Sequence, residues 1–400
     1  MIILNSKAVV FNVNTFEDLI DANPGDGICE ATLSMGDCSL RAAINETNAL
    51  PSDDSIIVPS GTFVLTITGD DDFGLAGDLD STFVGLTISG AGMNQTIIDG
   101  GGIDRIFHIS QSNLTLTDLT LKNGGAPMST VLGGAMNYSG DMTNSLNIER
   151  VKFDNNRANA AAGLYAAGST DNRPKVSIID SVFINNSTIN LGSTNQFGPA
   201  IFCNRCDLNI NNSTISHNGA GQKAIRVEVG DLKMINSTIS NNLEGGIRST
   251  NSDVLIKFST FYENGAQDLS FFSFDDSHIF EIGYSILQSS TNNNCQPGDL
   301  PTSLGYNLTS DSSCDFTMTG DLQTMNAQLE LLTNNGGLSE THRPANTSPV
   351  INQIPLDECL DLLGTSLIQD QRGEIRPHGG LCEIGSLEVN TDIIFKNGFE

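Results

Sequence analysis

The chain has 400 residues, and its 47 aspartates and glutamates outnumber 19 lysines and arginines, which gives a formal net charge of −28. So acidic a chain has no basic stripe to displace the counterions of a nucleic acid, and an anionic membrane surface would repel it. No apolar run reaches the about 18 residues of a membrane-spanning helix, while 38% hydrophobic residues and 40 glycines indicate a folded, turn-rich β protein.

The first 55 residues depart from the pattern of the rest and are predicted to form an N-terminal cap (residues 1–55). A tight-turn sequence at residues 23–27 precedes Cys38–Glu46, whose apolar residues have the spacing of a short helix. An open sheet end requires such a cover, because unpaired strand edges invite other chains. Met1–Leu4 is too short for the apolar part of a signal peptide, so we expect that a leader has been removed.

A repeat runs through the middle of the chain. Apolar markers recur at spacings of 22–32 residues, at Leu121, Phe153, Phe183, Ile215, Ile239 and Phe261. The residues five and seven positions before each marker are also apolar and alternate with polar residues, as in a strand with one buried face. These twelve residues are Leu116, Ile148, Ile178, Ile210, Met234 and Ile256, and Leu114, Leu146, Val176, Leu208, Leu232 and Val254.

This pattern predicts an all-β fold, a single-stranded right-handed parallel β-helix over residues 56–300 with a short N-terminal capping helix. Each coil of such a solenoid buries its apolar face only against its neighbours, and loops inserted between constant strands explain the uneven spacing. A β-propeller is excluded because each blade needs about 40–45 residues.

The third position after each marker is occupied by small polar or flexible residues. The column reads Gly124, Asn156, Asn186, Asn218, Asn242 and Asn264. Asparagine and glycine adopt positive φ angles at low cost. We therefore expect the column to form the corner at which each coil turns, and its asparagines to stack as a structural ladder.

The eight cysteines fall into four close pairs: Cys29 with Cys38, Cys203 with Cys206, Cys295 with Cys314, and Cys359 with Cys382. An even number in such a chain favours disulfides and an oxidising compartment. Cys203 and Cys206 also have the CxxC spacing of a redox pair or of half a zinc site. No further ligand at zinc-site spacing lies nearby in the sequence.

Several motifs resemble those of exported bacterial proteins. Cys38–Ile44 resembles the motif for which CSLREA-domain proteins are named, with Ala42 where the name has Glu, and residues 24–29, 77–80 and 99–107 resemble further segments of that family. Later motifs resemble the choice-of-anchor Q region, with Ser386-Leu387 replacing its usual Ala-Phe; they lie at residues 305–308, 334–337, 348–351, 370–373 and 382–385.

This resemblance implies a parallel β-helix body with repeats like those of polymorphic outer-membrane proteins, and it implies export but no established reaction. It divides the rest of the chain into a choice-of-anchor-like region at residues 301–390 and a tail of exported proteins at residues 391–400.

Two acidic clusters are candidate calcium sites, because calcium takes oxygen ligands from carboxylates. Asp207, Asp231 and Asp253 each lie eight residues before a marker, so the repeat stacks them in one column, where their repulsion favours a bound cation. The second cluster, in a glycine-containing loop, consists of Asp70, Asp71, Asp72, Asp78 and Asp80. The alternative for both clusters is a solvated turn without metal.

These features favour a secreted or outer-cell-surface β-helix that binds or adheres to an extracellular polysaccharide or another surface ligand and has no evident catalytic site. The alternative is an extracellular polysaccharide lyase or glycoside hydrolase that uses Asp207, Asp231 and Asp253 as acid–base or calcium carboxylates. Against it stand the net charge of −28, which repels acidic polysaccharides, and the lack of tryptophan for sugar stacking. The five histidines are scattered without metal-ligand spacing, and Arg41 is expected to form a salt bridge with the cap or with Asp26.

Overall fold

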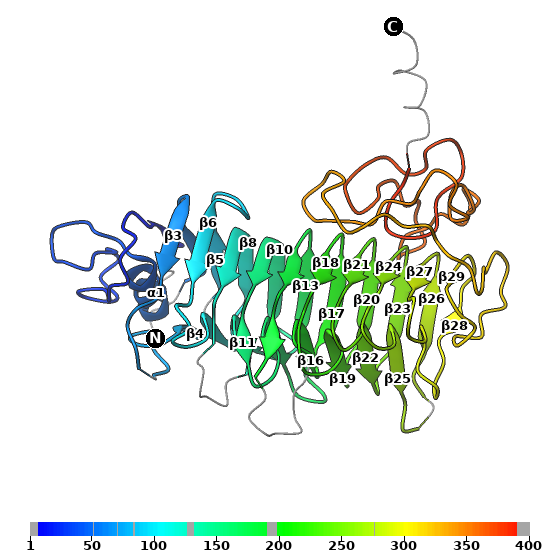
Figure 1. The fold of residues 1–400 in the computed structure, drawn as a ribbon. Coiled ribbons are helices and arrows are strands. Elements are labelled where there is room, and N and C mark those ends of the chain that lie inside the picture. Colours follow the sequence, from blue (N-terminus) through cyan, green and yellow to red (C-terminus); the bar gives the residue numbers. More distant parts are fainter. Residues whose placement is uncertain are drawn as a thin grey trace, which may run out of the picture. The chain divides into compact units, whose positions relative to one another are not determined.

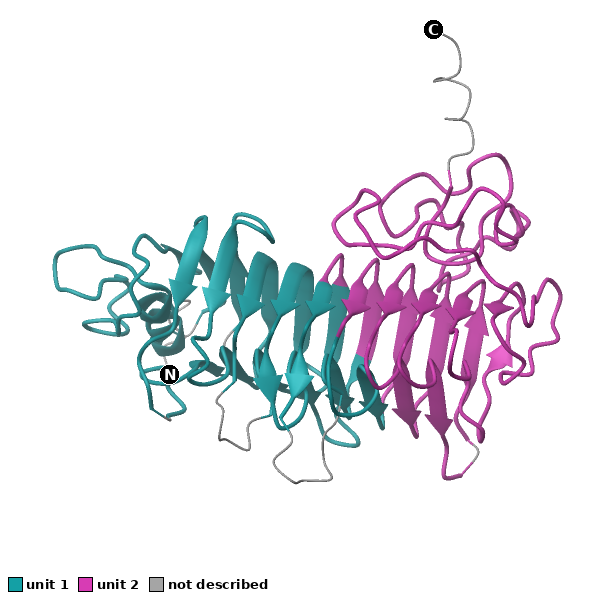
Figure 2. Ribbon diagram, viewed as in Figure 1, with its two compact units in different colours: residues 1–178, 182–207, 218–229 teal, residues 179–181, 208–217, 230–400 magenta. Residues whose placement is uncertain are grey.

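A computed structural model of the chain describes residues 7–50, 52–69, 71–82, 85–125, 132–189, 198–275 and 277–389. The chain divides into two compact units, shown in Figure 2. Unit 1 comprises residues 1–178, 182–207 and 218–229, and unit 2 comprises residues 179–181, 208–217 and 230–400. Each unit winds as coils of a right-handed parallel β-helix (Figure 1). The predicted tail at residues 391–400 lies outside the described residues.

The coils of unit 1 contribute strands to three columns, within which neighbouring strands pair in parallel. Column 1 contains β1 (Val10–Asn12), β2 (Asp54–Ile57), β5 (Leu86–Ser89), the first halves of β8 (Leu114–Lys122) and β10 (Ser145–Asp154), and β13 (Lys175–Ile179). Column 2 contains β3 (Gly61–Val64), β6 (Thr96–Asp99), the second halves of β8 and β10, and β14 (Val182–Ile184). Column 3 contains β4 (Leu79–Thr82), β7 (Phe107–Ser110), β9 (Met136–Ser139), β12 (Leu164–Ala167), β16 (Ile201–Asn204) and β19 (Ile225–Glu228), and β11 (Arg157–Ala158) pairs with β15 (Ser187–Thr188).

Unit 2 has the same three columns. Column 1 contains β17 (Asp207–Asn211), whose first residue belongs to unit 1, β20 (Leu232–Ile235), β23 (Val254–Lys257), β26 (Phe280–Gly283) and β28 (Thr302–Ser303). Column 2 contains β18 (Thr214–Ser216), β21 (Thr238–Ser240), β24 (Thr260–Tyr262), β27 (Ile286–Gln288) and β29 (Leu308–Thr309), and column 3 contains β22 (Ile247–Thr250) and β25 (Leu269–Phe272).

The capping helix predicted near residue 38 is α1 (Leu40–Ala49). It begins after Ser39 because the Ser39 hydroxyl accepts a hydrogen bond from the backbone N–H of Ala42 at 3.0 Å, which satisfies one of the free donors of the first turn. Its residues from Leu40 to Thr47 are buried in unit 1.

The predicted repeat forms the interior of the coils. All eighteen residues of the frame are buried, with at most 3% of their surface exposed. In unit 2, Met234 lies between Ile210 and Ile256 in register, and in unit 1 Phe153 stacks on Phe183 with ring centroids 4.3 Å apart. Burying each such side chain stabilises the fold by about 1.5–3 kcal/mol.

The asparagine column forms a ladder inside the wall. The Asn186 Oδ1 accepts hydrogen bonds from the backbone N–H and the side-chain amide of Asn156, at 3.1 and 2.9 Å, and the Asn186 Nδ2 donates to the Phe153 carbonyl at 3.0 Å. Asn242 and Asn264 repeat the first two bonds in unit 2, at 3.1 and 3.0 Å. All five asparagines are at most 1% exposed.

The expectation that these asparagines themselves turn the chain was wrong. The positive φ angle lies one residue earlier, at Asn123, Asn155, Asn185, His217, Asn241 and Glu263. After this left-handed residue the next side chain points inward, and a corner leaves backbone N–H groups without strand partners. The buried amide supplies the missing acceptor, which explains why asparagine recurs at the position after the turn.

At a second corner of unit 2, serine hydroxyls accept the hydrogen bonds of backbone N–H groups. The Ser213 N–H donates to the Ser237 hydroxyl at 3.2 Å, the Ser237 N–H donates to the Ser259 hydroxyl at 3.4 Å, and the Ser259 N–H donates to the Ser285 hydroxyl at 3.1 Å. Both corners therefore fix the register of neighbouring coils through buried hydrogen bonds.

Disulfide bonding is confirmed. The bonded pairs are Cys29–Cys38, Cys203–Cys206, Cys295–Cys314 and Cys359–Cys382. Because Cys203 and Cys206 are bonded to each other, neither offers a free thiol to a metal.

The C-terminal part of unit 2 covers the outer face of column 2. Thr214, Thr238 and Thr260 point outward from successive strands but are at most 2% exposed. The Thr238 hydroxyl donates to the Gln371 Oε1 at 2.6 Å, and the Ser386 N–H donates to the Thr260 hydroxyl at 3.1 Å.

The ladder provides a first prediction. We expect Asn186→Ala to lower the free energy of unfolding by roughly 2–4 kcal/mol, because the buried N–H of Asn156 and the carbonyl of Phe153 both lose their partner. Asn185→Gly is the matched control, since Asn185 has a φ angle of 59° that glycine adopts freely. Urea denaturation followed by circular dichroism measures both variants, and an equal loss in the two would contradict the role of the ladder.

Candidate functional site

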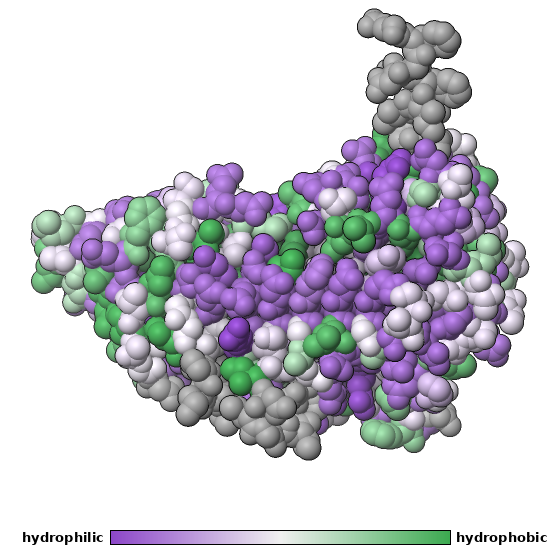
Figure 3. Space-filling model, in the orientation of Figure 1, coloured by the Kyte–Doolittle hydropathy of each residue, from purple (hydrophilic) through white to green (hydrophobic). Residues whose placement is uncertain are grey.

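The outer face of column 1 in unit 2 carries a groove, which we call the column-1 groove. Side chains of a strand alternate between its two faces, and the residues that point into the groove from the strands are Asn209, Asn211, Lys233, Ile235, Leu255 and Glu281. Register places Lys233 beside Asn209 on one side and Leu255 on the other. Two hollows of about 430 and 260 Å³ meet at Lys233. Hydrophilic residues gather over this face in Figure 3.

The larger hollow has a wall formed by the loop at residues 361–369, which lies far from the strands in sequence. The loop is attached at both ends: the Lys257 Nζ donates to the Asp361 carbonyl at 3.0 Å, and the Asn236 Nδ2 donates to the Gln369 carbonyl at 2.9 Å. Two of its apolar side chains remain open to solvent, Leu363 at 85% and Ile368 at 67% exposure. The hollow therefore combines an amide-bearing floor with an apolar wall.

The smaller hollow is lined by three acidic residues and by the same lysine. Asp231 and Asp253 precede the paired residues Leu232 and Val254, so the register brings them onto neighbouring coils. Glu281 enters from the next coil.

One of these carboxylates already has backbone and imidazole partners. The Asp253 Oδ1 accepts a hydrogen bond from the Ile279 N–H at 3.0 Å and lies 3.3 Å from the His278 Nδ1. Oxygen donors and a cation thus face the same space, an arrangement suited to sugar hydroxyls or to a calcium ion.

The first acidic cluster is only in part brought together. Asp231 and Asp253 line the groove, as the predicted column requires, whereas Asp207 belongs to unit 1 and forms a salt bridge with Arg173 at 3.1 Å. Sequence reasoning missed Lys233 and Glu281, although both occupy the outward position six residues before a marker or its equivalent. It also missed the wall, for which no local signal exists.

The second acidic cluster separates into different roles. Asp70 lies outside the described residues. Asp71 closes a local turn by accepting hydrogen bonds from two backbone N–H groups, at 2.7 and 3.1 Å. Asp78 is buried against Arg105, and burial raises the pKa of Asp78 to about 7 although the guanidinium opposes this shift. Asp72 and Asp80 approach His108.

Arg41 of the cap is a structural residue. It is fully buried, and its Nε lies 2.6 Å from the Asp18 Oδ1, so the expected salt bridge within the cap is present, with Asp18 rather than Asp26. Its remaining donors bind backbone carbonyls of residues 74–78 at 2.9–3.1 Å.

Unit 1 has a larger hollow, of about 650 Å³, lined among others by Asp99, Asn123, Asn155 and Arg157. Its polar groups largely bind one another: the Asn123 amide donates to both Asp99 oxygens at 3.0 and 3.1 Å, and the Asn155 amide donates to the Asn123 Oδ1 at 2.8 Å. The column-1 groove offers a richer set of charged side chains and is the stronger candidate.

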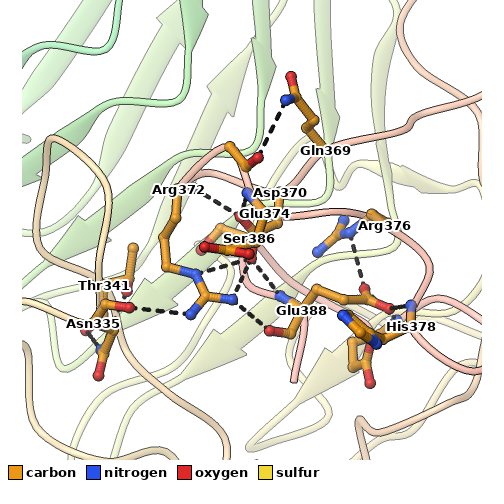
Figure 4. A network of polar contacts seen from close by, with 12 residues as sticks. Asn335, Thr341, Gln369, Asp370, Arg372, Glu374, Arg376, His378, Ser386 and Glu388 are labelled. Atoms are coloured by element: carbon orange, nitrogen blue, oxygen red, sulfur yellow. Dashed lines mark hydrogen bonds and ion pairs between the residues drawn. The ribbon is translucent and has the colours of Figure 1, made fainter. Parts of the chain in front are cut away.

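The wall of the groove continues into a buried charged network, which Figure 4 shows. Asp370, directly after the wall, binds the Arg372 Nη2 at 2.7 Å and the Glu388 N–H at 2.9 Å. The Arg376 Nε lies 3.1 Å from the Glu388 Oε2, and both side chains are fully buried. Glu383 is buried beside Glu388, and desolvation, together with that neighbouring carboxylate, strongly raises the pKa of Glu383, so that it keeps its proton at neutral pH.

No family model matches the chain, and no curated protein matches it. Among solved structures it is similar to a pectate lyase (13% identity, TM-score 0.47, covering 96% of this chain and 97% of the other). Others are a mannuronan C-5 epimerase module of Azotobacter vinelandii (13%, 0.29, 79% and 98%) and an alginate lyase of the PL6 family (11%, 0.29, 76% and 54%). Within the described residues, every helix is too short or too polar to cross a membrane.

The protonated Glu383 predicts a pH dependence of stability. The pKa of Glu383 in the folded state lies above the value of 4.5 that the residue has when exposed. Its contribution to the stability of the folded state is therefore fully present below pH 4.5 and is lost as the pH rises. Glu383→Gln keeps the shape and removes the titration. We therefore expect the stability of the variant minus that of the parent to increase by at least about 1 kcal/mol between pH 5 and pH 8.

Urea unfolding at both pH values measures this difference. A difference that stays constant with pH would show that Glu383 is ionised in the folded state. Asp315→Asn, which changes an exposed carboxylate of unit 2, is the control and should not alter the pH profile.

Proposed function

We propose that this chain binds an extracellular polysaccharide in the column-1 groove. The observation that carries the proposal is the joining of two hollows at Lys233, one with an amide floor and an apolar wall and one with three carboxylates. Amides and carboxylates hydrogen-bond sugar hydroxyls, while apolar side chains cover the C–H faces of sugar rings. Coils about 4.8 Å apart repeat these groups on the length scale of the units of an extended polysaccharide.

Two further features support a location outside the cell. The chain has four disulfides and no free cysteine among the described residues, which suits an oxidising compartment. Its motifs resemble the exported CSLREA-domain and choice-of-anchor Q proteins. We therefore propose secretion or display on the outer cell surface as the setting for polysaccharide binding.

Two sets of substitutions distinguish binding in the groove from binding elsewhere on the acidic surface. We expect Lys233→Ala combined with Leu363→Ser to weaken binding at least ten-fold, because the pair removes the cation shared by both hollows and an exposed apolar side chain of the wall. Lys175→Ala removes an exposed lysine of unit 1 and should leave affinity unchanged.

Glycan arrays followed by calorimetry on the best ligand measure this effect. The array includes neutral polysaccharides and the polymers named for the structural neighbours: pectate, mannuronan and alginate. Absence of saturable binding to any polysaccharide, or equal affinity of the groove variant and the parent, would refute the proposal.

A second candidate function is polysaccharide cleavage in the same groove, and the presence of Asp231, Asp253 and Glu281 in one hollow with Lys233 favours it. A lyase needs a base near the acidic C–H of a uronic acid and a cation that neutralises its carboxylate. Lys233 would be the base, and the carboxylates would hold calcium. A hydrolase would instead use two of the carboxylates as acid and base.

If the groove is catalytic, the parent should release unsaturated sugars or reducing ends from at least one polysaccharide, and Asp231→Asn and Asp253→Asn should each lower the rate at least 100-fold. Asp315→Asn should leave the rate unchanged. A chelator that abolishes release would indicate the calcium lyase. Binding without any turnover would reject catalysis and leave the chain a binding protein.

A further inference from the structure

A mixed cluster of metal-ligating side chains lies in unit 1, away from the column-1 groove. Asp80 on β4 and His108 on β7 are paired residues of neighbouring parallel strands, so the register of column 3 sets them side by side. The Asp80 Oδ1 lies 3.0 Å from the His108 Nδ1. Asp72 completes the cluster, since one ligand atom from each of the three residues lies within 4.8 Å of the other two.

The separation of the first two donors suits metal coordination. Two ligand atoms that each lie about 2.1 Å from a metal are about 3.0 Å apart at right angles and about 3.4 Å apart in the tetrahedral geometry typical of Zn²⁺. Without a metal the same pair forms a hydrogen bond. Binding would require only that the imidazole proton reside on Nε2, which is the tautomer that leaves Nδ1 free to ligate.

The surrounding structure holds this geometry in place. The Asp80 carboxylate is 1% exposed, and its Oδ2 accepts a hydrogen bond from the Gly74 N–H at 3.0 Å. The buried Arg41 guanidinium binds the carbonyls of Gly74, Gly77 and Asp78, which fixes the loop that follows Asp72. The cluster therefore needs little ordering when a ligand arrives.

The local charges leave a place for a cation. Arg105 pairs with Asp78, and Arg41 pairs with Asp18, so both guanidinium groups are already bound to carboxylates outside the cluster. Asp72 and Asp80 together carry two negative charges beside one imidazole, whose side chain is 25% exposed. A divalent cation would neutralise both carboxylates. Its remaining coordination positions would be open to water or substrate.

The donor set selects the class of metal. Calcium and magnesium prefer sites made entirely of oxygen, whereas imidazole together with carboxylates suits zinc, manganese and iron. We infer that Asp72, Asp80 and His108 form a binding site for a divalent transition metal, for which Zn²⁺ is the first probe. This assignment differs from the calcium site expected of the acidic loop, because it depends on a histidine that lies outside that loop.

Isothermal titration of the chelator-treated full chain with Zn²⁺, Mn²⁺ and Ca²⁺ tests the site. We expect one equivalent of Zn²⁺ to bind with a Kd in the micromolar range or below and Ca²⁺ to bind at least ten-fold more weakly. His108→Ala should weaken Zn²⁺ binding at least ten-fold. Asp72→Asn changes an exposed side chain and should also weaken Zn²⁺ binding. This variant tests the site even where His108→Ala does not fold.

His278→Ala is the matched control. His278 forms a similar His–Asp pair in unit 2, with Asp253 at 3.3 Å. Zn²⁺ affinity should be unchanged in this variant. Lack of saturable Zn²⁺ binding by the parent, equal affinity of the folded His108→Ala variant, or tighter binding of Ca²⁺ than of Zn²⁺ would each overturn the assignment.

Discussion

The structure depends on satisfying the backbone at the corners of its coils. Strands pair along their length, but the turning residues leave buried N–H groups without strand partners, and each would cost about 1–3 kcal/mol if unpaired. The ladders of Asn186 and its equivalents and of Ser237 and its equivalents supply the acceptors from the next coil. Since each ladder residue serves a neighbouring coil, a slip in register would break every rung and turn the apolar rows outward.

Fixed register then decides which outward side chains meet. It brings Asp231 and Asp253 onto neighbouring coils in unit 2, and it sets Asp80 directly beside His108 in unit 1. Neither pair is brought together by a loop. Both pairs follow from the strand register, which the buried apolar rows fix. The candidate functional side chains therefore point outward, at positions that the packing of the interior does not restrict. The buried rows set the register and so decide which of these outward side chains become neighbours.

This explains which features the sequence predicts. The interior rows follow from alternation alone, and every frame residue is buried. Some of the turning residues do not follow from propensity, because Arg150, Phe258 and Tyr284 adopt positive φ angles that tertiary packing imposes. His108 shows no ligand spacing because its partners lie 28 and 36 positions away in the sequence: Asp80 meets it through strand pairing, and Asp72 through the loop before β4. Asp207 follows the column pattern but binds Arg173, which lies 34 positions earlier in the sequence and which the repeat does not encode.

The wall of the column-1 groove has a different origin. Residues after Thr309 do not continue the apolar repeat. Val350, Ile354 and Ile384 join a buried apolar cluster, and the region around Arg376 buries charges as well. A buried ion pair gains little stability over a well-packed apolar pair, because both ions must be desolvated. Asp370 nevertheless pairs with Arg372 and accepts a hydrogen bond from the Glu388 N–H, and Glu388 pairs with Arg376, so that each group, if displaced, would lose its charged partner. Such a network fixes the position of the chain more than it adds stability. The segment whose position it fixes begins at Asp370, directly after the wall. The wall is therefore held by its bonds to Lys257 and Asn236, by the packing of Leu362 and Leu367 on the apolar cluster, and at its end by the charges around Asp370.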